Sequence, residues 1–216
     1  MALYSFPIDA EAQICGGALS TDSDDIWECI EYQDGISNMY YIGPVGVWFV
    51  PGGTDAYSDT FTFETDLTLN YSFIIAQCYT TFEIHFRRNN DNSISIRIVD
   101  ADVHGNGLCA NIGLENFTWY ASDKTSFSNT SSVDGAGSPG DIHPRDTGAT
   151  RVNLGNLKVI LLGSPVCTGY LADVDFYNGS AITTPTSIQF STTMFATACS
   201  MKATLKTIAN QDINAC

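Results

Sequence analysis

Three residues of types that bind metal ions alternate along one short segment of the chain. Asp100, Asp102 and His104 are separated by single residues and follow a run that reads as a β-strand. Alternate side chains of a strand point to the same side, which would place two carboxylates and an imidazole on one face. Hard oxygen ligands suit Ca²⁺. These three residues are therefore the candidate ligands of a calcium site, although the sequence favours a plain polar turn after a strand.

The segment only partly follows the pattern of an EF-hand calcium loop. His104 stands at the fifth position, and Asn111 stands at the twelfth, where that loop needs a bidentate Glu. Asp-x-His occurs at 102–104 and again at 141–143, as it does at the start of metallophosphoesterase sites. His85 is the only further histidine, too few for two metal shells, so that activity is rejected.

Paired carboxylates are the remaining catalytic candidates. A glycoside hydrolase needs two carboxyl groups about 5–9 Å apart, and Glu64, Glu83 and Glu115 are the acids that lie on predicted strands. The chain has no G-x-S-x-G nucleophile motif, no phosphate-binding loop and no zinc-type cysteine spacing. Nucleophilic, nucleotide-dependent and zinc-dependent chemistry are thus not indicated.

Aromatic side chains on predicted strands indicate a second kind of site. Exposed rings beside acidic or amide groups commonly hold sugars, whereas core packing is the usual role of large rings in β proteins. The candidate ligand-binding residues are Trp48, Trp119 and Tyr120, with Tyr40 and Tyr41 as further rings.

The best-defined element is a hairpin over residues 82–98, in which apolar and polar residues alternate on both arms. Opposed residues of an antiparallel pair must lie on one face. We therefore pair Phe86 with Ile94 and place Glu83 opposite Arg97, which leaves a five-residue loop.

Similar alternation elsewhere predicts an all-β protein of about ten short strands. Residues 61–71 alternate, the Asp34-Gly35 turn predicts a hairpin, and the apolar run 73–76 reads as a strand covered on both faces. A stretch without periodicity predicts one long loop near 121–150. Among sandwiches, jelly rolls and barrels, we expect an antiparallel, jelly-roll-like sandwich formed by one domain over 1–216.

The charge balance excludes several partners. The chain has 24 acidic and 9 basic residues, for a formal charge of -15. Nucleic acids and anionic membranes are bound largely through Lys and Arg, so neither is expected. The first residues do not resemble a signal peptide, which favours synthesis in a cytosol over a matured secreted chain. We expect most of the seven cysteines to be reduced, buried apolar residues, with Cys216 the one most exposed.

In style, the chain resembles the small, acidic β proteins rich in Thr, Gly and Asn that tailed phages and other viruses assemble on their particles. The resemblance implies a non-enzymatic virion structural protein, a capsid decoration or tail component synthesised in the host cytoplasm. Its partners would be copies of itself and other structural proteins, in a homo-oligomer. The alternatives are a carbohydrate-binding or adhesive β domain, either secreted or on a particle, and a β-fold hydrolase with paired carboxylates.

Overall fold

The computed structural model describes residues 30–33, 40–42, 45–46, 48, 61–91, 93–122, 142, 150–177, 185–194, 197–208 and 212–215. These residues form an all-β protein with a single short 3₁₀ turn, η1, at Cys109–Asn111. The strands are β1 (Ile30–Gln33), β2 (Tyr40–Ile42), β3 (Phe61–Tyr71), β4 (Ile74–Arg88), β5 (Ile94–His104), β6 (Ile112–Glu115), β7 (Trp119–Ser122), β8 (Thr150–Leu161), β9 (Ser164–Tyr177), β10 (Ser187–Thr193), β11 (Cys199–Thr207) and β12 (Asp212–Ala215).

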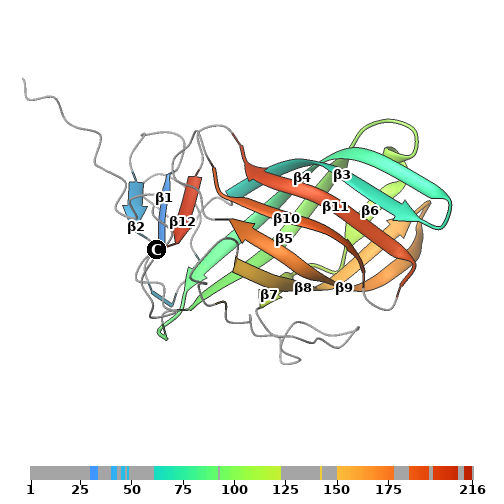
Figure 1. Cartoon of the computed structure of the whole chain (residues 1–216). Coiled ribbons are helices and arrows are strands. Elements are labelled where there is room, and N and C mark those ends of the chain that lie inside the picture. Colours follow the sequence, from blue (N-terminus) through green and yellow to red (C-terminus); the bar gives the residue numbers. More distant parts are fainter. Residues whose placement is uncertain are drawn as a thin grey trace, which may run out of the picture.

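The main sheet closes into an eight-stranded antiparallel barrel (Figure 1). Strands β3, β4, β5, β7, β8, β9, β10 and β11 pair in sequence order, and β11 pairs back to β3. β6 and β7 both pair with β8, at different positions along it. The all-β prediction is confirmed. The architecture is a barrel rather than the expected jelly-roll-like sandwich, and its strands are up to 15 residues long. Register shifts in the β4–β5 and β8–β9 ladders are bulges, and bulges increase the local bend and twist of a sheet.

Alternation along the strands sends apolar side chains into the barrel. On β3, Phe61, Phe63, Thr65 and Leu67 are buried, while the residues that alternate with them are more exposed. The rings of Phe86 on β4 and Phe176 on β9 have centroids 6.3 Å apart. Those two strands lie on opposite sides of the barrel, so side chains fill its interior at this level.

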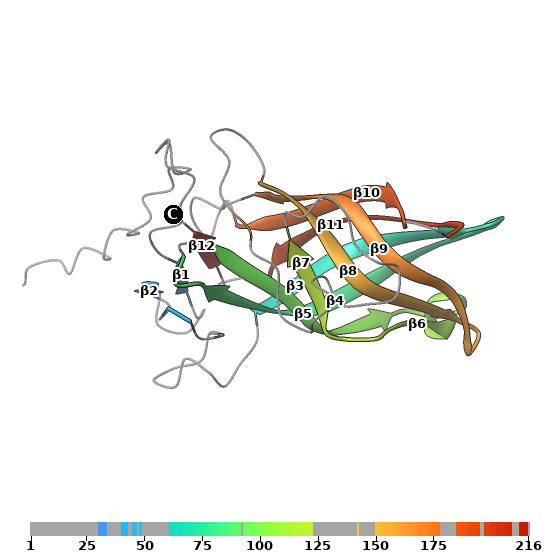
Figure 2. The ribbon, with the colours of Figure 1, turned by 90° about the horizontal axis from the view of Figure 1, so that it is seen from below.

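A three-stranded sheet of β12, β1 and β2 lies beside one end of the barrel (Figures 1 and 2). Ile213 of β12 is buried with the barrel core, and its carbonyl accepts a hydrogen bond from Thr186. β1 and β2 pair antiparallel as neighbours along the chain, as the predicted hairpin requires, but Gln33 lies opposite Tyr40, whereas a two-residue Asp34-Gly35 turn would place it opposite Ile36. That turn itself lies outside the described residues.

The β4–β5 hairpin keeps the predicted face but not the predicted register. Phe86 pairs with Ile96 rather than Ile94, and His85 takes the place of Glu83 opposite Arg97. The shift is two residues, so every side chain stays on its expected face. The shift follows from the loop, where the Asn89 backbone N–H donates to the Ser93 carbonyl at 2.8 Å. The two strands therefore stay paired up to Arg88 and Ile94, each one residue further along the chain than in the predicted last pair.

Two disulfides, which the sequence analysis did not expect, join described cysteines. Cys78 of β4 is bonded to Cys109 of η1, and Cys167 of β9 is bonded to Cys199 of β11. For these four residues the prediction of reduced thiols is wrong, because the strands bring them together from about thirty positions apart. Cys216 lies outside the described residues.

The predicted loop at 121–150 lies mostly outside the described residues. Within it, Ile142 is fully buried and forms a two-way backbone bridge with Ile94, with both N···O distances at 2.9 Å. None of the described helical segments is long and apolar enough to cross a membrane.

Candidate functional site

A basic and aromatic cluster covers the outer face of β4, β5 and β7. The guanidinium carbons of Arg97 and Arg87 lie 4.1 and 4.9 Å from the centroid of the Trp48 ring. Arg97 is also hydrogen-bonded to Tyr120, its partner on β7. The structure thus brings together two of the three predicted ligand-binding residues, Trp48 and Tyr120, around arginines that the sequence analysis did not single out.

Alternation explains why the third predicted residue is elsewhere. Trp119 directly precedes Tyr120 on β7, so its side chain points into the barrel, where it is 1% exposed. Its indole N–H donates to the Glu115 carbonyl at 2.9 Å, and its ring stacks on Phe117. In this position Trp119 offers no ring face to a ligand. Tyr120 instead packs outside the main core, beside Tyr170.

His85 completes the cluster as a neutral acceptor. Arg97 places its Nε and Nη2 atoms 3.2 and 2.9 Å from His85 Nδ1, and a guanidinium can only donate, so Nδ1 accepts. Burial, followed by the positive charge of Arg97, lowers the pKa of His85 to about 4. The imidazole is therefore uncharged at neutral pH.

The loop below the cluster is held by a buried polar network centred on Asn89. Arg87 Nε donates to Asn89 Oδ1 at 2.7 Å, and Asn89 Nδ2 donates to the hydroxyls of Ser93 and Ser95 at 2.8 and 2.9 Å. Asp91 Oδ1 accepts from the backbone and hydroxyl of Ser93. Next to this network is a surface pocket of about 420 Å³, lined by Gly46, Arg87, Asn89, Asn90 and Asp91.

The candidate calcium ligands share a face, as expected, but that face is the open outer surface of β5. Asp100, Asp102 and His104 are all exposed. His104 Nε2 lies 3.1 Å from the Thr81 hydroxyl, and Asn111 Nδ2 donates to a backbone carbonyl. The described residues contain no group of three His, Cys, Asp or Glu side chains placed to hold a metal ion. Asp141 and His143 lie outside the described residues.

The three strand-borne glutamates also lie on the outer surface. Glu64 of β3 accepts a hydrogen bond from Tyr79 at 2.5 Å, which raises the pKa of the Tyr79 hydroxyl. Glu115 pairs with Lys158 at 2.8 Å, and Glu83 lies opposite Asp100. Among the described pockets, none is lined by these glutamates.

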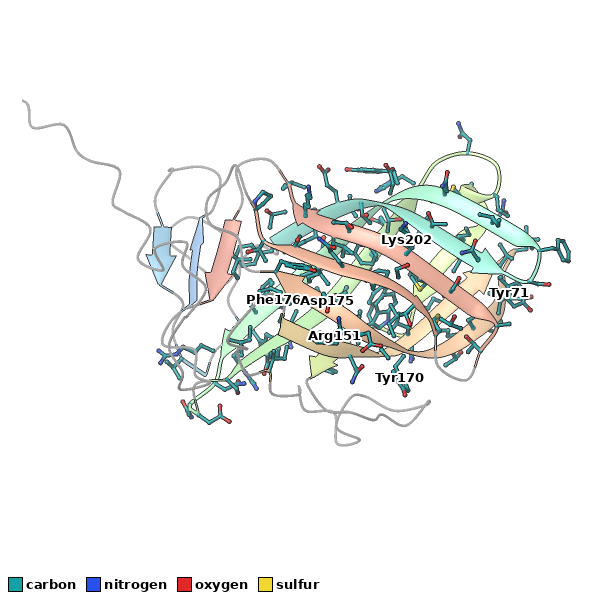
Figure 3. All side chains as sticks on the ribbon, viewed as in Figure 1. Tyr71, Arg151, Tyr170, Asp175, Phe176 and Lys202 are labelled. Atoms are coloured by element: carbon teal, nitrogen blue, oxygen red, sulfur yellow. A yellow bond between two sulfur atoms is a disulfide. The ribbon has the colours of Figure 1, made fainter. Side chains whose placement is uncertain are left out.

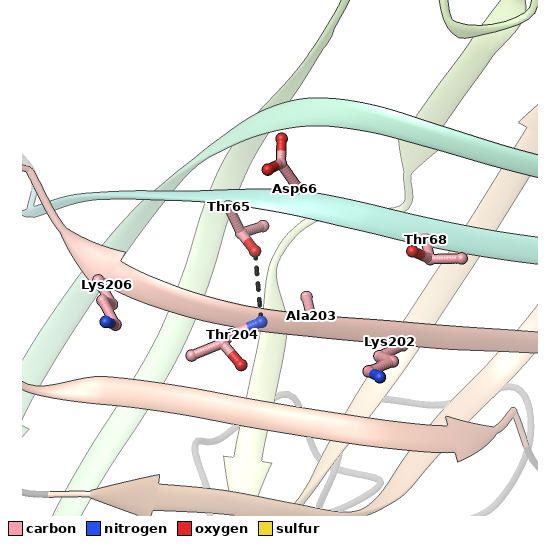
Figure 4. Close-up of a pocket in the computed structure, with 7 residues that line it drawn as sticks. All are labelled: Thr65, Asp66, Thr68, Lys202, Ala203, Thr204 and Lys206. Carbon is pink, nitrogen blue, oxygen red and sulfur yellow. Dashed lines mark hydrogen bonds between the residues drawn. The ribbon is translucent and has the colours of Figure 1, made fainter.

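Two surface grooves flank β11. One runs along β3, where the ladder is interrupted and the Thr204 backbone N–H donates to the Thr65 hydroxyl at 3.3 Å (Figure 4). The other lies toward β9, near the ion pair of Arg151 and Asp175, 2.9 Å apart (Figure 3). Lys202 lines both grooves. The polar groups that line them are largely solvent-exposed.

The barrel end far from the three-stranded sheet carries no Asp, Glu, Lys or Arg among its described residues, which are 69–76, 103–113, 159–167, 191–194 and 197–200. Two hairpin turns project there: Ser72-Phe73 between β3 and β4, and Leu162-Gly163 between β8 and β9 (Figures 1 and 2). Phe73 is 91% exposed, and Ile75 and Leu162 are each 68% exposed. We call this surface the uncharged end. Of the run 73–76, which was predicted to be a strand covered on both faces, Phe73 lies in the turn and residues 74–76 begin β4. Ala76 is buried, but Ile75 is exposed, so only one face of this strand is covered.

Comparison with known proteins found no match to this chain, whether by family model, among curated proteins or among solved structures.

Proposed function

We propose that this protein is a non-enzymatic structural protein of a virus particle, a decoration or tail component, and that it assembles through its uncharged end. The observation that carries the proposal is the exposure of Phe73, Ile75 and Leu162 at an end whose described residues include no Asp, Glu, Lys or Arg. Protein interface cores are depleted in charge and enriched in aromatic residues. Exposed apolar patches of this kind mark interaction sites.

The occupant we propose for this end is a second copy of the chain. Each copy carries a formal charge of -15, so most pairs of faces would bring like charges together. Two like unit charges 4 Å apart repel each other by about 1 kcal/mol in water and by several times more at a partly buried interface. The uncharged end is a surface where two copies can meet without that cost.

The backbone at the turn supports a role for the Leu162 side chain itself. Leu162 has φ 53° and Gly163 has φ 77°. A two-residue turn with both φ values positive favours Asn-Gly, because a branched side chain is strained in the left-handed region. An exposed Leu held in that conformation points to selection for its apolar surface rather than for the turn.

The disulfides support exposure of the mature protein to an oxidising medium. Such bonds persist in secreted proteins and on virion surfaces but are rare in the cytosol. A virion component synthesised in the host cytoplasm would form them on release or in an oxidising compartment. A secreted chain, the alternative location, satisfies the same observation.

Oligomeric state tests the proposal. Size-exclusion chromatography with light scattering should show a concentration-dependent oligomer for the wild-type chain. Phe73→Ser and Leu162→Asn should shift it to monomer, and Leu162→Asn should also raise the melting temperature, since Asn relieves the strained φ. Tyr177→Ser, at the opposite end of β9, is the control and should leave assembly unchanged. A wild-type chain that stays monomeric at every concentration would overturn the self-assembly proposed here.

Salt provides an independent check on the nature of the contact. An uncharged contact has no ion pairs to screen, so added NaCl should strengthen association by reducing repulsion between the acidic flanks. Association that weakens with salt would show that ion pairs hold the copies together, and the uncharged end would not be the interface.

A further inference from the structure

We propose that the pocket beside the β4–β5 loop binds an acidic saccharide, a sugar that carries one carboxylate. The pocket is lined by Gly46, Arg87, Asn89, Asn90 and Asp91. It lies at the end of the barrel opposite the uncharged end, so this inference goes beyond the proposed assembly function and does not depend on it.

Arg87 supplies the group that would bind the carboxylate. Its Nε atom donates to Asn89 and its Nη2 atom lies 3.5 Å from the Ser95 hydroxyl, while Nη1 makes no hydrogen bond to a described residue. It forms no ion pair with a described carboxylate, although the chain has 24 acidic residues. A guanidinium fixed in this way presents a preorganised donor edge to an oxyanion.

The other lining groups suit hydroxyls. Asn90 is exposed, and its amide makes no hydrogen bond to a described residue, so both its donor and its acceptor are available. Asp91 also lines the pocket, with its Oδ1 accepting from Ser93. One cation and one amide in the pocket complement a ligand with one negative charge and several hydroxyls, while the Asp91 carboxylate opposes any further negative charge.

The same groups disfavour more highly charged ligands. A phosphate ester would bring a second negative charge close to Asp91 and into the field of a chain of charge -15. The pocket volume of about 420 Å³ lies within the range of small-molecule sites. Gly46, at φ +78°, forms one wall, and a Cβ at this position would stand 3.8 Å from Asn90 Oδ1. A backbone without a side chain therefore keeps that side of the pocket open.

Titration of the labelled full chain with sodium glucuronate, followed by amide NMR shifts, tests the inference. Glucuronate should shift the amides of Gly46 and residues 87–91 with saturation, glucose should not, and sodium acetate should bind more weakly. Acetate binding as tightly as glucuronate would reduce the pocket to a simple anion site and overturn the saccharide assignment. The absence of shifts at these residues with glucuronate would overturn the site altogether.

Two variants and a control locate the binding. Arg87→Gln should weaken glucuronate binding by at least about tenfold, the usual effect of losing one charge-assisted pair. Because Arg87 also bonds Asn89, Asn90→Ala serves as the second variant: its side chain supports nothing else described, so the fold should persist while binding weakens. Arg151→Gln, on the outer face of β8, is the matched control. Equal affinity in all three variants would refute the proposed contacts.

Discussion

Protonation of His85 should destabilise the fold in acid, and the structure gives the size of the effect. Burial and Arg97 lower the pKa of His85 from its ordinary 6.5 to about 4 in the folded chain. The unfolded chain therefore takes up the proton first as the pH falls. The stabilising contribution of neutral His85 is complete above about pH 6.5, declines between 6.5 and 4, and is lost once the pH has fallen through 4.

A difference of about 2.5 between the two pKa values corresponds to about 3.4 kcal/mol at most. The imidazole is partly open to solvent, so screening should reduce the measured effect to roughly 1.5 kcal/mol. Many carboxylates titrate in the same range, so the wild-type chain alone cannot isolate it. His85→Gln removes the titration while keeping an acceptor for Arg97.

Urea unfolding at several pH values between 4 and 8 measures the effect. The free energy of unfolding of the wild type minus that of His85→Gln should fall by about 1.5 kcal/mol as the pH drops from 6.5 to 4. Arg97→Gln, which removes the nearby charge but not all of the burial, should raise the pKa of His85 only part of the way to 6.5. A difference curve that is flat, or that rises in acid, would show that His85 does not stay neutral in the folded chain at the expense of stability in acid.

Three further stability predictions rest on single contacts. Asn89→Ala removes the centre of a buried hydrogen-bond network and should lower the free energy of unfolding by about 2–3 kcal/mol, as measured by urea unfolding. Asn90→Ala should change it by no more than about 0.5 kcal/mol. Equal losses in the two variants would contradict a stabilising role for the network. Phe86→Ala removes a ring that meets its partner across the barrel and should cost about 3–5 kcal/mol by the same assay. Replacing Cys78 and Cys109 together by Ser should cost about 3.5 kcal/mol from the chain entropy of the loop; an unchanged melting temperature, or no bridged peptide in non-reducing mass spectrometry, would contradict the bond.

The period of two predicted which side chains face the core but not which residues pair. Phe86 opposes an isoleucine in either register, since Ile94 and Ile96 are both apolar and two apart. The choice between them was made by hydrogen bonds of the Asn89 loop, a local polar network that hydrophobic patterning does not record. The five residues between β4 and β5, 89–93, match the predicted loop length, and they lie one residue further along the chain than predicted.

Periodicity also could not distinguish a strand covered on both faces from a strand with one exposed apolar face. Residues 73–76 were predicted to be buried because four apolar residues in a row usually are. In the structure, Phe73 lies in the turn before β4 and Ile75 is exposed on β4, opposite Asn70, whereas Ala76 is buried. At the neighbouring turn the sequence does contain a signal. Leu162-Gly163 occupies a two-residue hairpin turn, where Asn-Gly would be expected, so the Leu there is an unusual exposed apolar residue.

The candidate sites were recovered in part, for reasons that lie in strand geometry. Trp119 and Tyr120 are neighbours and therefore cannot both face outward on one strand, so predicting both as ligand-binding residues conflicted with the alternation used elsewhere. Arg87 and Arg97 were missed because each reads as an ordinary polar-face residue. Only the pairing of β4 with β5 sets them diagonally across from each other.

Exposed apolar side chains, together with the absence of charge among the described residues, are the reason to regard the uncharged end as an interaction surface. Acids are 24 of 216 residues, so an even spread would place one at about every ninth position. Residues 69–76, 103–113 and 159–167 contain none and include no Lys or Arg either, although they come from separate parts of the sequence. Up-and-down topology alone brings these segments to one end of the barrel. Stretches without charge also occur elsewhere, at 35–54 and over 176–201, so the absence of charge does not by itself single out this end. What distinguishes it is that Phe73, Ile75 and Leu162 are exposed there, as expected of a surface that contacts a partner without bringing like charges together.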